Sequence, residues 1–278
     1  MNRFGYSLLE RFLFPFYEIQ PELLKQRMAG KTVVITGATF GIGESIARTL
    51  AKHGAHLILI ARTEERLHLL SAELSKDGST ITCIPCDLYD PEAVGQLSKK
   101  LAEVEGGVDV FINNAGKSIH RSIWESLDRH HDFTRTIQLN YLSPVALAMA
   151  LVPALAEKKG QIIHISAINT LLPAAPGWAA YQASKVAMKE WVESTSEELE
   201  QKGIVSSIVY LPLVRTRMIA PTEAYKNAPA MHPDHVAMVV ANLLTSRKRS
   251  FKPWWLLVIR PFVGLTKSFW RRRMSTLK

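Results

Sequence analysis

The 278 residues suffice for a full hydrophobic core, and 47% of them are hydrophobic, which excludes general disorder. The formal net charge is +9, but residues 247–278 hold ten basic residues and no acidic one, leaving 24 basic against 25 acidic residues elsewhere. The body of the protein is therefore not predicted to bind nucleic acid. Two cysteines, Cys83 and Cys86, are too few for a disulfide framework and favour a reducing compartment.

Residues 1–28 form an apolar, aromatic arm. Its apolar side chains recur at roughly helical spacing, which favours a helix packed on the body over a membrane contact; they are Phe4, Leu8, Leu9, Phe12, Leu13 and Phe16. Acidic residues and a proline interrupt the arm, and no small-residue cleavage site follows, so no signal peptide is predicted. No apolar run reaches the ~18–20 residues of a membrane-spanning helix. We therefore expect a cytoplasmic protein, with association with the inner face of a membrane as the alternative.

Short apolar runs alternate with helical patterns from residue 29 to residue 246. The predicted strands lie at 31–36, 55–61, 80–84, 108–112, 161–166 and 204–211. The predicted helices lie at 41–53, 63–77, 91–104, 128–157 (with a break at Pro144) and 180–202. This alternation predicts an α/β fold, a doubly wound parallel, Rossmann-like sheet in a single domain. Residues 1–28 and 247–278 are then N- and C-terminal extensions.

A glycine-rich turn lies between the first strand and the first helix, reading Thr36-Gly-Ala-Thr-Phe-Gly-Ile-Gly43. Glycines allow a sharp turn and the close approach of a pyrophosphate, and the following helix supplies N–H groups and a positive dipole. This position predicts a dinucleotide site with cofactor contacts from Gly37, Thr39, Phe40, Gly41, Ile42 and Gly43.

The second strand ends Ile60-Ala61-Arg62, without the acidic residue that would bind an NAD ribose hydroxyl. Ala61 leaves room for a 2′-phosphate, and the guanidinium of Arg62 can pair with it through two hydrogen bonds. The sequence therefore predicts NADP(H) as the cofactor.

Tyr181 and Lys185 are four residues apart and share one face of a predicted helix. A phenol has a pKa near ~10, and an ammonium beside it would lower that pKa towards the working range. The Asn-Asn-Ala-Gly run at 113–116 and Ser166 precede this pair. Together these residues predict a nicotinamide-dependent oxidoreductase. The nine histidines show no ligand spacing, so no metal site is predicted.

With these motifs the sequence resembles the short-chain dehydrogenase/reductase family over about residues 30–246. The family's T-G-x-x-x-G-x-G occurs at 36–43, its N-N-A-G at 113–116 and its Y-x-x-x-K at 181–185. The resemblance implies a homo-oligomer and further site residues. They are Asp87 for the adenine, Asn114, Ala115 and Gly116 for the cofactor, Asn140 for the proton-relay water, and Thr216 for the nicotinamide carboxamide.

Two departures from the family pattern affect the implied roles. Ser166 lies 15 residues before Tyr181, two more than is usual in the family, and an insertion within 168–175 would restore it to the catalytic role. Asn169 and Thr170 are the alternatives. The segment before Thr216 lacks one residue and the glycine of the family pattern.

We expect hydride transfer between the nicotinamide and a carbonyl or alcohol carbon of a hydrophobic substrate such as a lipid, steroid or long-chain aldehyde or ketone. Tyr181 would exchange the proton, Lys185 would bind the nicotinamide ribose, and Ser166 would hydrogen-bond the substrate oxygen. The alternative is a non-catalytic NADP(H)-binding scaffold or sensor that docks to membranes or partners through its termini. The basic, aromatic segment 247–278 fits either an anionic membrane surface or an element that closes the substrate cleft or packs on a partner subunit.

Overall fold

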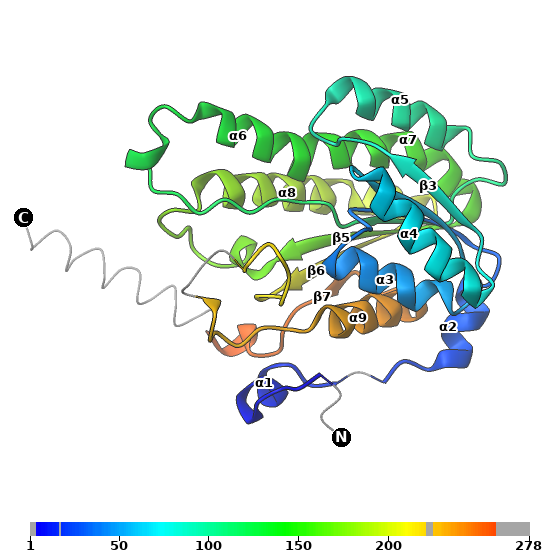
Figure 1. Ribbon diagram of the computed structural model, residues 1–278, viewed down its shortest axis with the longest axis horizontal. Helices are drawn as coiled ribbons and strands as arrows, with labels where there is room; N and C mark the ends of the chain where they lie inside the picture. The colour runs from blue at the N-terminus through cyan, green and yellow to red at the C-terminus, as the bar shows by residue number, and fades with distance from the viewer. Residues whose placement is uncertain (1–3, 17, 221–224, 260–278) are drawn as a thin grey trace, which may run out of the picture.

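Seven parallel strands form the central sheet of the computed structural model, which describes residues 4–16, 18–220 and 225–259 (Figure 1). They lie in the order β3-β2-β1-β4-β5-β6-β7. Their bounds are β1 Thr32–Thr36, β2 His56–Ala61, β3 Ile81–Pro85, β4 Val110–Asn113, β5 Gln161–Ala167, β6 Val205–Leu211 and β7 Ser250–Phe251. The first six confirm the predicted strands, with shifts of one or two residues at their ends. The strand order reverses between the parallel neighbours β1 and β4: successive strands are added on one side from β1 to β3 and on the other side from β4 to β7. Such a topological switch point opens a crevice at the carboxyl ends of the strands.

Helices cover both faces of the sheet, which confirms the doubly wound α/β prediction (Figure 1). On one face α3 (Gly41–Ala51), α4 (Glu64–Leu74) and α9 (Pro233–Ser246) share a core with the inward side chains of β1 and β2. On the other face lie α5 (Pro91–Ala102), α7 (Ser143–Lys158) and α8 (Ala179–Gln201). Because both faces are covered, β1 is buried at every residue, as its β-branched sequence requires.

The long helix predicted at 128–157 forms at 130–158 and is continuous. It consists of α6 (His130–Ile137), a π-helical turn at Gln138–Leu142, and α7. The break predicted at Pro144 does not occur, because the backbone stays helical through the π-helical turn just before that proline. Residues 130–158 are the one described stretch long and apolar enough to cross a membrane, but 44% of its apolar window is buried against the body. That packing is typical of a core helix.

The N-terminal arm contains α1 (Leu8–Leu13) and α2 (Pro21–Met28). Tyr6, Phe14 and Leu24 are buried against the body, whereas Leu8 and Phe12 are exposed. The predicted packed arm is thus seen, but much of the apolar face of α1 points outward. α9 and β7 were not expected, and β7 extends the sheet beyond residue 246. Residues 260–278 of the basic tail lie outside the described residues.

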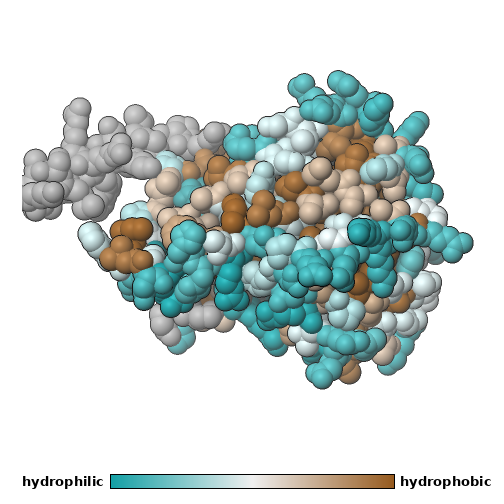
Figure 2. All heavy atoms as spheres, turned by 90° about the horizontal axis from the view of Figure 1, so that it is seen from above, coloured by the Kyte–Doolittle hydropathy of each residue, from teal (hydrophilic) through white to brown (hydrophobic). Residues whose placement is uncertain are grey.

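The face formed by α5, α6 and α7 carries apolar side chains across its middle, with polar side chains along its edges (Figure 2). Leu142 and Met149 contribute to it, with 47% and 64% of their surface exposed. Three 3₁₀ turns complete the described structure, at Ser75–Asp77, Trp124–Ser126 and Ile168–Thr170.

Candidate active site

The carboxyl ends of β1, β4, β5 and β6 border a cavity of about 550 Å³. Eleven of the predicted site residues line it: Gly37, Phe40, Gly41, Ile42, Asn114, Ala115, Gly116, Ser166, Tyr181, Lys185 and Thr216. The other five, Thr39, Gly43, Arg62, Asp87 and Asn140, lie outside its lining. The fold therefore brings together residues that are up to 179 positions apart in the sequence, from Gly37 to Thr216.

The glycine-rich turn is packed so closely that it has no space for a side chain at Gly43. A Cβ at Gly43 would overlap the Gly37 carbonyl oxygen and come within 2.6 Å of Asn114 Nδ2. Gly41 has a φ of +57° and is the first residue of α3, so the unpaired N–H groups at the start of that helix lie at the turn. A backbone cradle without side chains at a helix N-terminus suits a pyrophosphate.

Asn114 joins this turn to the end of β4. Its Nδ2 donates to the carbonyls of Thr36 (2.9 Å) and Gly37 (3.1 Å). In return, Thr36 Oγ1 accepts from the backbone N–H groups of Asn114 (3.0 Å) and Ala115 (3.1 Å). The glycine-rich turn and the Asn-Asn-Ala-Gly run are thus joined by hydrogen bonds into one edge of the site. The sequence did not indicate that the Thr36 side chain accepts two of these bonds.

Tyr181 and Lys185 lie in the first turns of α8. Lys185 is buried, and its ammonium donates to the Ile165 carbonyl of β5 (3.0 Å). Burial lowers the pKa of Lys185 to about 8. Burial, with a smaller contribution from Tyr225, raises the pKa of Tyr181 to about 12. The prediction that Lys185 lowers the phenol pKa is wrong in this geometry, because burial disfavours the phenolate and the ammonium is bound to the strand.

Asn140 lies behind the cavity, within the π-helical turn. It accepts from the Lys117 N–H (2.9 Å) and donates to the Lys117 carbonyl and to Ser184 Oγ (both 2.9 Å). A Cβ at Gly116 would meet Asn140 Oδ1 at 3.1 Å and Lys185 Nζ at 3.3 Å. The asparagine and the lysine are therefore neighbours separated only by Gly116.

Ser166 ends in the same cavity as Tyr181, at the carboxyl end of β5. The 3₁₀ turn Ile168–Thr170 follows, inside the stretch where an insertion was predicted. Thr170 Oγ1 donates to the Ala167 carbonyl (2.8 Å), so this hydroxyl already has a partner. Asn169 also lines the cavity, and its Oδ1 is buried with no hydrogen-bond partner among the described residues.

Thr216 closes the cavity from the segment after β6. Its Cγ2 lies 3.0 Å from the position of a Cβ on Gly41. The neighbouring Arg217 has its Cζ 3.8 Å from the centroid of the Phe40 ring, and Arg66 approaches the same ring at 4.9 Å. The contact of Arg217 fixes the segment to the glycine-rich turn, and that of Arg66 comes from α4. Neither arginine carried a recognisable sequence motif.

Arg62 and Asp87 lie beyond the cavity, after β2 and β3 respectively. Arg62 is exposed at the strand end, and the Tyr89 N–H donates to Asp87 Oδ1 (3.0 Å). β2 and β3 lie on the side of β1 that is opposite to β4, β5 and β6. Arg62 and Asp87 therefore continue the predicted cofactor site from the glycine-rich turn in the direction away from Tyr181. No group of three or more His, Cys, Asp or Glu suited to a metal occurs in the described part of the chain.

The family model for short chain dehydrogenases matches residues 31–227. The chain belongs to the short-chain dehydrogenase family. It is 42% identical to a fatty acyl-CoA reductase of Acinetobacter baylyi over 228 residues, covering 82% of this chain and 77% of the relative. It is 38% identical to a fatty acyl-CoA reductase of Mycobacterium tuberculosis over 221 residues, covering 77% and 75%. A metagenomic short-chain oxidoreductase crystallised with NADP superposes with a TM-score of 0.67 and 31% identity, covering 79% and 92%.

Two aromatic residues lie over Tyr181 in this short-chain dehydrogenase: Trp178, which the sequence reasoning missed, and Tyr225, which it expected to cover the pocket. The ring centroid of Trp178 lies 5.8 Å from that of Tyr181 and 6.4 Å from that of Tyr225, on which the Trp178 ring stacks. All three residues line the cavity. They come from the start of α8 and from the segment after β6, so only the tertiary structure brings them together.

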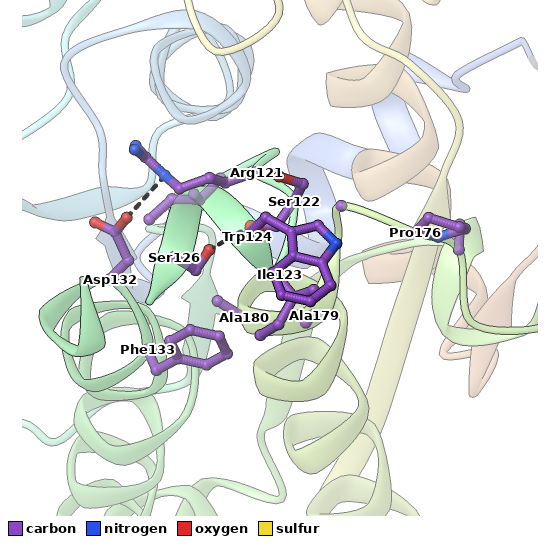
Figure 3. A pocket seen from close by; sticks show the side chains of 13 residues that line it. Arg121, Ser122, Ile123, Trp124, Ser126, Asp132, Phe133, Pro176, Ala179 and Ala180 are labelled. Atoms are coloured by element: carbon purple, nitrogen blue, oxygen red, sulfur yellow. Dashed lines mark hydrogen bonds and ion pairs between the residues drawn. The ribbon is translucent and has the colours of Figure 1, made fainter. Parts of the chain in front are cut away.

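Figure 3 shows a second cavity, of about 390 Å³. Ala175 lines both cavities. The side chains of Ile123, Trp124 and Phe133 form much of its wall, and an Arg121–Asp132 ion pair (Nε–Oδ2 3.1 Å) lies at one side. The second cavity is therefore a largely apolar compartment that shares one wall residue with the first.

Proposed function

We propose that this short-chain dehydrogenase uses NADPH to reduce the carbonyl group of a long-chain fatty acyl substrate, presented as a thioester or an aldehyde. The observation that carries the proposal is the single cavity shared by Tyr181, Lys185, Ser166 and the glycine-rich turn, under an apolar cover. The two relatives called fatty acyl-CoA reductases support the substrate class.

The residues present fit an NADP(H) cofactor. The glycine-rich turn would take the pyrophosphate against its backbone, and α3 begins there at Gly41, so its first N–H groups are available to the phosphates. Arg62 at the end of β2 would pair with the 2′-phosphate, and Thr216 would contact the nicotinamide end. The related oxidoreductase crystallised with NADP supports this choice.

The bound cofactor supplies hydride to the carbonyl carbon. Tyr181, which burial keeps protonated at neutral pH, donates its phenolic proton to the carbonyl oxygen. Ser166 donates a hydrogen bond to the same oxygen as charge develops on it. Lys185 would bind the ribose hydroxyls, and Asn140, which like Lys185 lies beside Gly116, would hold the water that returns the proton. With a thioester, the resulting hemithioacetal expels the thiol and leaves the aldehyde.

The test is NADPH consumption with palmitoyl-CoA and hexadecanal. Tyr181→Phe should lower kcat by ~10²–10⁴-fold while NADPH binding persists. Tyr210→Phe, which removes a buried hydroxyl outside the cavity, serves as the matched control and should keep its activity. Wild-type protein that binds NADPH but consumes none with either substrate would contradict the proposal and favour a non-catalytic binding protein.

The alkyl chain of the substrate would lie in the second cavity. The wall residue Ala175, which both cavities share, and the apolar wall with Ile123, Trp124 and Phe133 support this placement. Ile123→Asp should lower kcat/KM for palmitoyl-CoA about tenfold, as expected for losing roughly 1.4 kcal/mol of apolar contact. Butyryl-CoA, whose chain is too short to reach it, should be unaffected. Equal losses for both substrates would contradict the placement.

We also propose that the enzyme is cytoplasmic and docks on an anionic membrane through its two ends. Trp254 Nε1 donates to the Phe12 carbonyl (3.1 Å), and their rings meet edge to face at 4.9 Å. Exposed apolar side chains surround this contact, namely Leu8, Leu9, Leu257 and Val258. The sequence then continues into the basic segment, a combination suited to lipid headgroups. Phe12→Glu should reduce sedimentation with phosphatidylserine vesicles, whereas Leu69→Glu, at an exposed leucine of α4, should not.

A homo-oligomer is proposed to form through the apolar face of α7. Leu142 and Met149 are exposed there, and Figure 2 shows apolar residues gathered across that side. Met149→Lys should shift the enzyme to a smaller species in analytical ultracentrifugation. An unchanged sedimentation coefficient would place the interface elsewhere.

A further inference from the structure

Helix α1 of the arm carries a buried carboxylate, Glu10, which is 6% exposed. Its Oε2 accepts from the N–H (3.0 Å) and hydroxyl (3.1 Å) of Ser7, which caps the helix. Its Oε1 accepts from Arg215 Nη2 (2.5 Å) and from the Ala230 N–H (3.1 Å). Carboxylates are rarely buried unless paired, so these contacts hold the arm to residues more than 200 positions away.

The two contacts of Glu10 on the body lie at the two ends of one segment. Val214 and Met231 form a bridge, and the Arg215 N–H donates to the Met231 carbonyl (2.9 Å). Between these ends the chain supplies Thr216 and Tyr225 to the cavity. Glu10 therefore fastens both ends of the segment that borders the active site, from outside the 31–227 region matched by the family model.

Thr216 stands between two anchored arginines. Arg215 is held by Glu10, and its Cζ also lies 5.5 Å from the Tyr6 ring centroid, so both of its partners belong to the arm. Arg217 is held on the other side by Phe40 of the glycine-rich turn. The position of Thr216 against Gly41 is thus set jointly by the turn and by the arm.

We propose that Glu10 is a positioning residue for the reaction: through Arg215 it holds Thr216 against the glycine-rich turn, and so sets how tightly the nicotinamide end of the cofactor is bound. The inference rests on the proposed function for the identity of the cofactor. A purely structural anchor would behave differently, because it would change the unfolding temperature without changing the cofactor affinity of the folded protein.

The test measures NADPH binding by fluorescence titration, together with KM and kcat, in the full chain well below the lowest unfolding temperature. Glu10→Gln should raise the Kd and KM for NADPH about tenfold, while the smaller Arg215→Lys change should raise them less. Glu18→Gln, at an exposed carboxylate of the same arm, should match wild type. In a double-mutant cycle, Arg215→Gln should add little to Glu10→Gln, because both remove the same contact.

A fall in unfolding temperature with wild-type NADPH affinity in Glu10→Gln and Arg215→Lys would overturn the inference and leave Glu10 as an anchor only. If Glu10→Gln fails to fold, Arg215→Lys decides alone, since a wild-type Kd there refutes the positioning role. Failure of the proposed function is distinguishable, because it shows in the wild type as absent NADPH binding or absent turnover.

Discussion

Gly43→Ala tests whether the cofactor cradle is as tight as the structure indicates. The added Cβ would overlap the Gly37 carbonyl oxygen and lie 2.6 Å from Asn114 Nδ2. Neither atom can retreat easily, because the Asn114 amide already donates to the Thr36 and Gly37 carbonyls. Overpacking of this kind costs ~1–3 kcal/mol. We expect the unfolding temperature to fall by several degrees. We also expect the Kd for NADPH to rise about tenfold for each ~1.4 kcal/mol of binding free energy that the substitution removes.

The assay is thermal unfolding with and without NADPH, beside a fluorescence titration. Gly95→Ala is the matched control, since Gly95 is exposed on α5 and a Cβ there meets nothing within 4 Å. The same substitution in that helix should stabilise the protein by ~0.5–1 kcal/mol and leave NADPH affinity unchanged. Wild-type affinity and unfolding temperature in Gly43→Ala would refute the reasoning from the cradle.

Three further predictions concern single residues of the site. Arg62→Asp should lower the ratio of kcat/KM for NADPH over NADH by ~10–100-fold, as expected for losing a charge-assisted bond of ~1.5–3 kcal/mol; an unchanged ratio would contradict 2′-phosphate binding there. Asn140→Ala removes one buried hydrogen bond to Ser184 and two partly buried ones to Lys117 and should cost ~2–4 kcal/mol in urea unfolding, so a loss below ~1 kcal/mol would contradict its bracing role. Burial lowers the pKa of Lys185 from its ordinary value of 10.5 to about 8 in the folded protein, so between these values the unfolded chain binds one more proton and stability rises with pH. In urea unfolding from pH ~8 to pH ~10, Lys185→Met should lack that rise, and an identical pH slope in both proteins would contradict the burial of a titrating ammonium.

The conformational preferences of short runs of residues allowed the fold and about half of the site to be predicted from the sequence. A run such as Thr32–Thr36 is short and largely β-branched, so it favours a buried strand wherever it occurs, and the glycines after it favour a turn. Parallel strands then place their carboxyl ends at one edge. That rule alone predicts that the glycine-rich turn, Asn114 and Ser166 meet, as the cavity confirms.

Other features, such as β7 and the pKa of Tyr181, depend on contacts between segments that are distant in the sequence, and no local pattern encodes such contacts. The two-residue strand Ser250–Phe251 is too short to carry a periodicity and exists only because it pairs with β6. The pKa of Tyr181 depends on how much protein surrounds the ring, which spacing from Lys185 does not reveal.

The arm shows the same division. Its amphipathic spacing predicted a helix, and α1 forms, but which face is buried was set by partners elsewhere in the chain. Glu10 points inward because its carboxylate accepts hydrogen bonds from Arg215 and from the Ala230 N–H, whereas Leu8 and Phe12 remain exposed. The sequence by itself determined the strands, the glycine-rich turn and the pairing of Tyr181 with Lys185 on one helix face. Only the tertiary structure decided the burial that shifts their pKa values and the link from the arm to Thr216, because both depend on contacts between separate elements, which for Glu10 and Arg215 lie 205 residues apart.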